Sequence, residues 1–243
     1  MIARAVSLAW AKRPRISRLF PNYPRPMNIE QARFNMIEQQ IRPWDVLDGG
    51  VLGLLSRVRR EDFVPPEHRA LAFTDTEIPL PEGQCMLAPR VEARLLQELR
   101  LTGVERTLEI GAGSGFMACL LGHQSRSVTS LEIRPALADM ARQNLARARM
   151  GQVQVVQADG SQGSAVEGNF DAIVLSGSVA LEPDALKARL NLGGRLVAVI
   201  GDEPVMRALR ITRVAADAWE TAVLFDTVAP RLQGFPQPSR FTF

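Results

Sequence analysis

The chain has 243 residues, 46% of them hydrophobic and 23% charged, which is typical of a globular protein and excludes a disordered one. The formal net charge of +3 comes from the first 26 residues, which hold six basic side chains and no acid; residues 27–243 carry 23 basic and 26 acidic residues, net −3. A basic nucleic-acid surface therefore has no support outside residues 1–26, and no run of about 18 apolar residues indicates a membrane span.

Residues 1–26 form a basic, Pro- and Arg-rich extension that we expect to be disordered and leave out of the predicted fold. Three interpretations stay open for this extension. It is sequence upstream of a natural start at Met27, an Arg-rich organellar presequence, or a basic tail with a binding role.

The N-terminal helical segment is predicted to cover residues 27–82 and to pack on the core. Apolar residues at helical spacing predict helices over 28–42, with Asn28 as N-cap, and over 47–59. The stretch 61–83 is rich in proline and acid and is expected to be an irregular connection. A further helix begins at Pro89 and continues to Leu101.

From residue 106 strands and helices alternate, which predicts a parallel sheet covered on both faces. The expected fold class is α/β, with a doubly wound, mostly parallel, seven-stranded Rossmann-like sheet and a C-terminal antiparallel hairpin. The predicted strands are 106–110, 127–133, 152–158, 170–176 and 194–200, followed by the hairpin strands 208–215 and 219–229. The predicted helices between them are 115–123, 135–149 and 183–190.

The two cysteines, Cys85 and Cys119, and the two histidines, His68 and His123, do not have metal-ligand spacing, so no metal site is expected. Two thiols do not indicate a disulfide framework either, and a reducing cytoplasm is the expected location.

The stretch "LEIGAGSGF" ends a predicted strand in three glycines at alternate positions and opens a helix. Glycines there let the backbone approach a ligand closely, and the helix start offers free N–H groups. Phe116 stands where the NAD fingerprint has its third glycine, and the P-loop Lys is absent. The pattern E-x-G-x-G-x-G is typical of S-adenosylmethionine-dependent methyltransferases, and its candidate cofactor-binding residues are Glu109, Gly111, Ala112, Gly113, Ser114 and Gly115.

Two acids follow at the ends of the next strands. Glu132, with Ile133, lies 21 residues after Gly111, where an acid can accept both ribose hydroxyls. Asp159 and Gly160 follow the third strand, where an acid can face the adenine edge; a plain Asp-Gly turn is the competing interpretation. Together with the loop they predict a nucleoside site.

Around this core, residues 28–229 resemble the protein-L-isoaspartate O-methyltransferase family. The discriminating segment precedes the cofactor loop, and its matching residues are Arg60, Glu61, Phe63, Val64, Pro65, Asp75, Pro79, Gly83 and Gln84. "LEIGAGSGF", "LEIRP", "DG", "FDAIVLSG" and "LNLGGRLVAVIG" then follow in the family's order. The resemblance implies S-adenosylmethionine as cofactor, a methyltransferase domain over 83–243, and carboxyl methylation of L-isoaspartyl residues in damaged proteins.

This chemistry needs no general base, because a carboxylic acid with a pKa of about 4 is ionised at neutral pH. The sequence departs from the family in "GQCMLAP", where Leu87 replaces the hydroxyl residue at the methyl position and Cys85 replaces a small hydroxyl residue. Substrate positioning would then come from backbone N–H groups around 85–88 and from Ser176 or Ser178. The candidate catalytic positions are Leu87, Cys85 and Ser176.

Two alternatives stay open. One is a methyltransferase of the same scaffold with a different small-molecule or protein acceptor, for which the apolar residues at 85–87 provide a more apolar pocket. The other is an S-adenosylmethionine-binding adaptor without enzymatic activity. The sequence gives no indication of oligomeric state.

Overall fold

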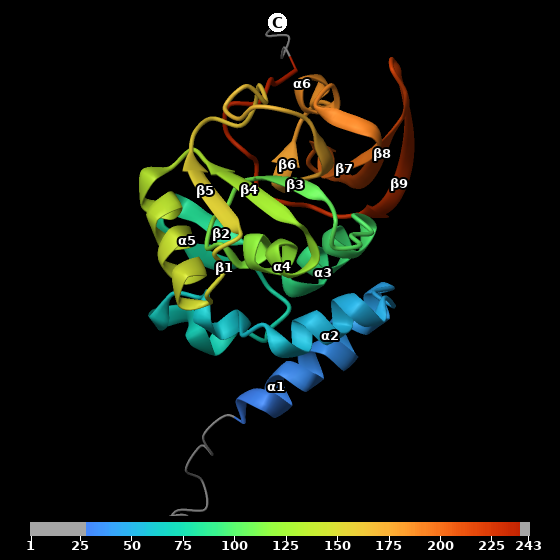
Figure 1. The fold of residues 1–243 in the computed structure, drawn as a ribbon. Coiled ribbons are helices and arrows are strands. Elements are labelled where there is room, and N and C mark those ends of the chain that lie inside the picture. The colour runs from blue at the N-terminus through green and yellow to red at the C-terminus, as the bar shows by residue number, and fades with distance from the viewer. Residues whose placement is uncertain (1–27, 239–243) are drawn as a thin grey trace, which may run out of the picture.

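The computed structural model describes residues 28–238, so the expectations for residues 1–26 lie outside it. A seven-stranded sheet in the order β5-β4-β3-β6-β7-β8-β9 forms its centre (Figure 1). The five strands β5, β4, β3, β6 and β7 are parallel to one another. β8 pairs antiparallel with β7, and β9 pairs antiparallel with β8. Their bounds are β3 (Arg106–Ile110), β4 (Ser127–Glu132), β5 (Val153–Gln157), β6 (Phe170–Val179), β7 (Leu190–Asp202), β8 (Val205–Ala215) and β9 (Ala218–Asp226). The predicted mostly parallel sheet with its C-terminal hairpin is confirmed.

The strand order reverses at β3, whose last residue Ile110 is paired with Leu131 of β4 on one side and with Leu175 of β6 on the other. The strands on both sides therefore end at the same edge of the sheet as β3. β3 and β6 are buried for nearly their whole length, as expected for parallel strands that are covered on both faces. The reversal at β3 leaves room at this edge for a ligand.

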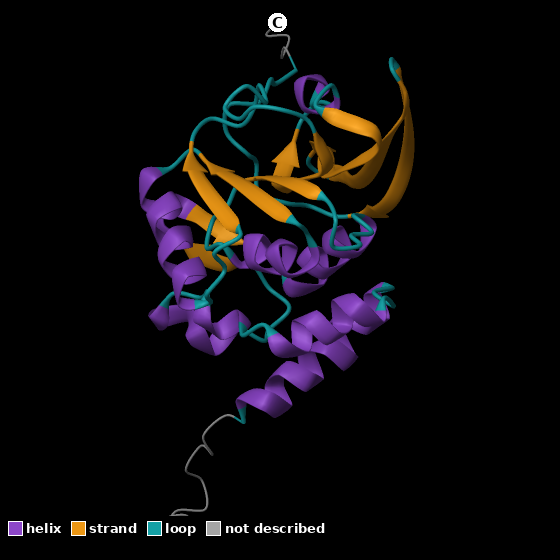
Figure 2. Cartoon of the chain, viewed as in Figure 1, coloured by secondary structure: helices purple, strands orange, loops and turns teal. Residues whose placement is uncertain are grey.

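The two faces of the sheet are covered differently (Figure 2). On one face lie α3 (Pro89–Glu98), α4 (Phe116–Gln124) and α5 (Pro135–Arg147), and their apolar side chains share a core with the N-terminal helices. The other face has a separate core with only the short α6 (Asp184–Lys187) and loops over it. The helix predicted over 183–190 is shorter because β7 begins at Leu190.

The N-terminal helices pack on the outside of the α3 and α4 layer. α1 (Ile29–Met36) is capped by Asn28 and continues through a π-helical turn, Ile37–Ile41, and a 3-10 turn, Arg42–Trp44. α2 (Gly49–Arg57) is capped by Asp48, whose carboxylate accepts the backbone N–H of Val51. No helix of the described residues combines the length and hydropathy that crossing a membrane requires.

The connection 61–83 is more ordered than predicted. It contains 3-10 turns over Arg60–Asp62, Pro66–Leu71 and Pro81–Gly83 and ends in β1 (Ile78–Leu80), which pairs with β2 (Gln84–Met86). Strands of three residues are too short to show an alternation of apolar and polar residues in the sequence. The expected division between 82 and 83 falls inside this hairpin.

Candidate functional site

The glycine loop lies at the carboxyl end of β3, where the strand order reverses. Gly111 has φ of 91° and donates its N–H to Leu131 of β4 at 2.8 Å, which fixes the loop against the neighbouring strand. Gly115 has φ of 83° and precedes α4, where a Cβ would come within 3.2 Å of the Ala141 Cα. Glycine at 115 is thus required by helix packing as well as by backbone conformation.

Glu132, the last residue of β4, holds this loop. Its side chain is buried, with 5% exposed, and its two carboxylate oxygens accept the backbone N–H groups of Gly113 at 2.9 Å and Arg134 at 3.1 Å. The acid predicted for the ribose hydroxyls is therefore hydrogen-bonded to the backbone at the centre of the glycine loop. Ile133, the next residue, is 37% exposed.

Glu109 lies in β3 below the loop and is fully buried. It accepts hydrogen bonds from the hydroxyls of Ser130 at 2.5 Å and Ser176 at 2.8 Å. Burial raises the pKa of Glu109 to about 8, against the opposing effect of these two hydroxyls. The Glu109 side chain is therefore largely a neutral carboxylic acid at pH 7.

A small cavity of about 20 Å³ joins the glycine loop to the segment that departs from the expected family pattern. It brings together eight of the predicted site residues: Cys85, Leu87, Glu109, Gly111, Ala112, Gly113, Ser114 and Ser176. Residues that the sequence did not single out for this site complete the lining, namely Leu80, Met86, Glu92, Phe116 and Met117.

The most informative of these is Glu92, because it forms an ion pair with Arg60 in which both side chains are almost completely buried. Arg60 also donates to the backbone carbonyl of Leu87 at 2.8 Å, and its guanidinium lies 4.8 Å from the centre of the Phe116 ring. Arg60 thus links the N-terminal segment to both sides of the cavity. Burial raises the pKa of Glu92, and the Arg60 charge opposes this effect.

Glu92 did leave a signal in the sequence. In a helix it shares a face with Leu95, Leu96 and Leu99, and a carboxylate on an apolar helical face indicates a buried partner. Arg60 was part of the family pattern but had no predicted role.

Three further predictions are placed outside this cavity. Asp159 is exposed and accepts the N–H of Ser161 at 2.9 Å, and a Cβ on Gly234 would lie 2.6 Å from its Oδ1, so the C-terminal segment passes close to it. Gly160 packs against Ile110. Ser178 does not line the cavity: it is buried, and its hydroxyl donates to the carbonyl of Ala229 at 2.8 Å, which leaves Ser176 as the serine that faces the cavity.

Cys85 lines the cavity but is not activated. Its Sγ lies 3.4 Å from the carboxylate of Glu77, and burial, reinforced by that charge, raises the pKa of the thiol to about 12. A thiol with so high a pKa does not act as a nucleophile at neutral pH. Among residues 28–238, no three His, Cys, Asp or Glu side chains gather in a way that would hold a metal ion.

The donor set of the site fits S-adenosylmethionine. A carboxylate at the end of β4 suits a ribose, and the glycine backbone before α4 suits close approach of the cofactor's amino-acid part. The cavity of about 20 Å³ has room for about one water molecule, and Glu132, the candidate acceptor for the ribose hydroxyls, lies outside it.

Comparison with known proteins shows which family the chain is similar to. Residues 31–228 match the family model for protein-L-isoaspartate(D-aspartate) O-methyltransferase. Protein-L-isoaspartate O-methyltransferase 1 of Rhodopseudomonas palustris (strain HaA2) is 41% identical over 186 residues, which is 76% of each chain. A second protein-L-isoaspartate O-methyltransferase, from strain CGA009 of the same species, is 37% identical over 84% of this chain and 95% of its own.

A solved structure supports the fold. The protein-L-isoaspartate O-methyltransferase structure from Plasmodium falciparum, in complex with S-adenosyl-L-homocysteine, superimposes with a TM-score of 0.69 at 22% identity, covering 86% of this chain and 99% of its own. At that identity the likeness concerns the fold alone.

Proposed function

Since the chain belongs to the protein-L-isoaspartate O-methyltransferase family and is an S-adenosylmethionine-dependent methyltransferase, we propose that it methylates the side-chain carboxylate of L-isoaspartyl residues in damaged proteins. The observation that carries the proposal is the single cavity in which the segment 85–87 faces the glycine loop. It is supported by the extent of the family match, which includes the segment 60–84 ahead of the cofactor loop.

The residues that would hold the cofactor are Glu132 and the backbone of the glycine loop 111–115. When bound, S-adenosylmethionine supplies a methyl group on a positively charged sulfur. The chain's task is to place a carboxylate oxygen in line with that methyl group and to exclude water. No side chain has to remove a proton, since the acceptor carboxylate is already ionised at neutral pH.

Two acids line the same cavity, and neither presents an uncompensated negative charge to an incoming carboxylate. Glu92 is paired with Arg60, and Glu109 holds its proton at pH 7 because burial raises its pKa to about 8. Without these arrangements two negative charges would repel the substrate in a medium of low dielectric constant. We therefore propose a charge-balancing role for Glu109, with Ser176 as its hydrogen-bond donor.

Leu87 cannot donate a hydrogen bond to the substrate. Its carbonyl is held by Arg60, so the backbone of residues 85–88 has a fixed course past the cavity. We propose that backbone N–H groups of this segment position the carboxylate. In this division of work, residues 27–82 supply Arg60, and residues 83–243 form the cofactor-binding domain, which also carries the segment 85–88.

A cytoplasmic location is part of the proposal. It is supported by Cys85 and Cys119, which are both free thiols.

The test is methyl transfer from radiolabelled S-adenosylmethionine to an isoaspartyl peptide, compared with the aspartyl peptide of the same sequence. We expect base-labile methyl ester only on the isoaspartyl peptide. Gly113→Val is the control, since Gly113 has φ of 52°, which a β-branched residue rarely adopts, and the variant should lose cofactor binding and transfer together.

One observation favours a second candidate, a methyltransferase with a more apolar acceptor. Cys85 and Leu87 present apolar groups where the family has hydroxyls, and Met86 between them lines the same cavity. Cofactor binding without turnover of the isoaspartyl peptide, combined with labelling of another compound in cell extract, would support that acceptor. Binding without any methyl transfer would support an adaptor.

A further inference from the structure

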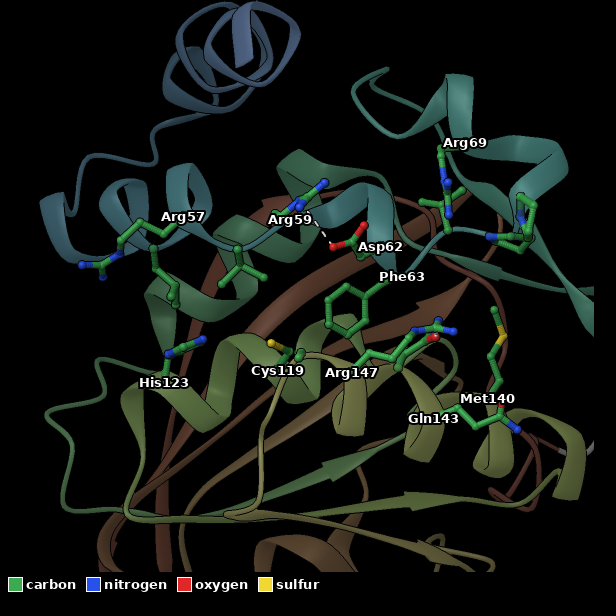
Figure 3. Close-up of a pocket in the computed structure, with 17 residues that line it drawn as sticks. Arg57, Arg59, Asp62, Phe63, Arg69, Cys119, His123, Met140, Gln143 and Arg147 are labelled. Atoms are coloured by element: carbon green, nitrogen blue, oxygen red, sulfur yellow. Dashed lines mark hydrogen bonds and ion pairs between the residues drawn. The ribbon is translucent and has the colours of Figure 1, made fainter. Parts of the chain in front are cut away.

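A cavity much larger than the one at the glycine loop lies apart from the cofactor site. It has a volume of about 1040 Å³ and lies between the N-terminal segment and the outer surface of α4 and α5 (Figure 3). α2 and the connection 58–69 form one wall, and α4 and α5 form the other. This volume is at the upper end of the range for small-molecule sites.

The floor of this cavity is apolar. Leu54, Val58, Phe63 and Cys119 line it, and each is at most 7% exposed. Figure 3 shows the Phe63 ring near the middle, between the wall that carries Arg59 and Arg69 and the one that carries Arg147. Because these four side chains are almost completely buried, an apolar group would touch them only at the bottom of the cavity and would lie mainly against Pro66 and Met140, which also line it and are more exposed.

The rim is cationic. Four arginines line it, of which only Arg59 has an acidic partner there, Asp62 at 3.4 Å. Among residues 28–238, the side chains of Arg57 and Arg69 form no ion pair or hydrogen bond, and the side chain of Arg147 donates only to the amide oxygen of Asn144. Three positive charges thus remain without a compensating carboxylate.

His123 also lines the cavity, and the positive charge of the rim affects its pKa. Burial lowers the pKa of His123 and the charge of Arg57 lowers it further, so the imidazole is neutral at pH 7 and can accept or donate a hydrogen bond.

Helix ends account for part of this arrangement. Arg57, His123 and Arg147 stand in the last turns of α2, α4 and α5, where cations are favourable. Each helix end carries roughly half a negative charge, so three ends offset about half of the three uncompensated arginines. The cavity therefore keeps a positive potential above an apolar floor.

We propose that this cavity binds a small amphiphilic dianion, a compound with a flat apolar body and at least two anionic groups. The body lies against Pro66 and Met140 above the buried floor, and the anionic groups reach the rim arginines Arg57, Arg69 and Arg147. The site is separate from the cofactor site, although the two meet at one aromatic pair, in which the Phe63 and Phe116 ring centres are 5.5 Å apart.

The probe is naphthalene-1,5-disulfonate, titrated calorimetrically into the full chain with saturating S-adenosylhomocysteine, so that the cofactor site is not available to it. We expect one probe per chain, bound more tightly than either inorganic pyrophosphate, which lacks the apolar body, or 1-naphthalenemethanol, which lacks the charge. The assay contains no methyl acceptor, so its outcome does not depend on the isoaspartyl activity.

Arg57→Gln, Arg69→Gln and Arg147→Gln should each weaken probe binding by roughly threefold to tenfold, as expected for ion pairs at a partly exposed rim. Arg142→Gln is the matched control, because Arg142 lies on α5 outside the cavity and pairs with Asp139. It should leave binding unchanged. Absence of binding by the parent chain, or equal losses in the control and the three variants, would overturn the proposal. If pyrophosphate bound as tightly as naphthalene-1,5-disulfonate, the apolar floor would not contribute to binding, which would contradict that part of the proposal.

Discussion

The carboxylate of Glu132 accepts the backbone N–H of Gly113 at 2.9 Å and so joins the end of β4 to the centre of the glycine loop. Glu132→Ala would remove both this contact and the proposed acceptor for the ribose hydroxyls. We expect S-adenosylhomocysteine binding to weaken by about 1–3 kcal/mol, roughly 5- to 150-fold, measured by calorimetry. Asp139→Ala, on the exposed side of α5, is the control and should bind like the parent. Unchanged affinity in Glu132→Ala would make the acid purely structural.

The second prediction concerns pH. Burial raises the pKa of Glu109 from 4.5 to about 8, so over this interval the folded chain holds a proton that the unfolded chain has lost. The contribution of Glu109 to stability is therefore greatest below pH 4.5 and is lost as the pH rises towards 8. Glu109→Gln removes this titration, and its melting temperature should fall less than that of the parent between pH 5 and pH 8. Parallel melting curves for the two chains would contradict the assigned protonation.

The contrast between Glu132 and Glu92 shows what the sequence could reveal. Glu132 was predictable because a strand end, a glycine loop and a fixed offset are all local features. The Arg60 and Glu92 pair joins residues 32 positions apart, and nothing periodic connects them. The close approach of Gly234 to Asp159 and the β1–β2 hairpin were missed for related reasons, since one depends on a distant segment and the other on strands of three residues.

The third prediction concerns that buried ion pair. Arg60→Met should destabilise the chain by about 3–5 kcal/mol in urea unfolding, because it leaves Glu92 charged or forces it to take up a proton in an apolar environment. Arg60→Met combined with Glu92→Leu should recover much of this loss, since an apolar pair of similar volume replaces both charges. In either case methyl transfer should remain impaired, because the Leu87 carbonyl has lost its donor. Additive losses in the double variant would argue against coupling.

The fourth prediction concerns residues 1–26. α1 begins with its own cap, in which Asn28 accepts the N–H of Gln31 at 3.2 Å, so the helix does not depend on the preceding residues for its first turn. A chain beginning at Met27 should keep the melting temperature and the S-adenosylhomocysteine affinity of the full chain. A clear loss of stability would mean that the basic extension packs on the domain.

The last prediction concerns Leu87, which is 4% exposed and faces the cavity together with Cys85 and Ser176. If backbone N–H groups position the acceptor carboxylate, the parent chain methylates isoaspartyl peptide and Leu87→Ser changes the rate only modestly. Leu87→Ala, which makes a cavity without adding a hydroxyl, separates lost packing from gained hydrogen bonding. If the pocket instead suits another acceptor, the parent is nearly inactive on this peptide. Leu87→Ser then recovers activity by up to the roughly 10²-fold that one transition-state hydrogen bond can supply, while Leu87→Ala recovers none. We expect the first outcome, because Arg60 already fixes the backbone at Leu87 and the neutral Glu109 leaves the cavity open to a negative charge.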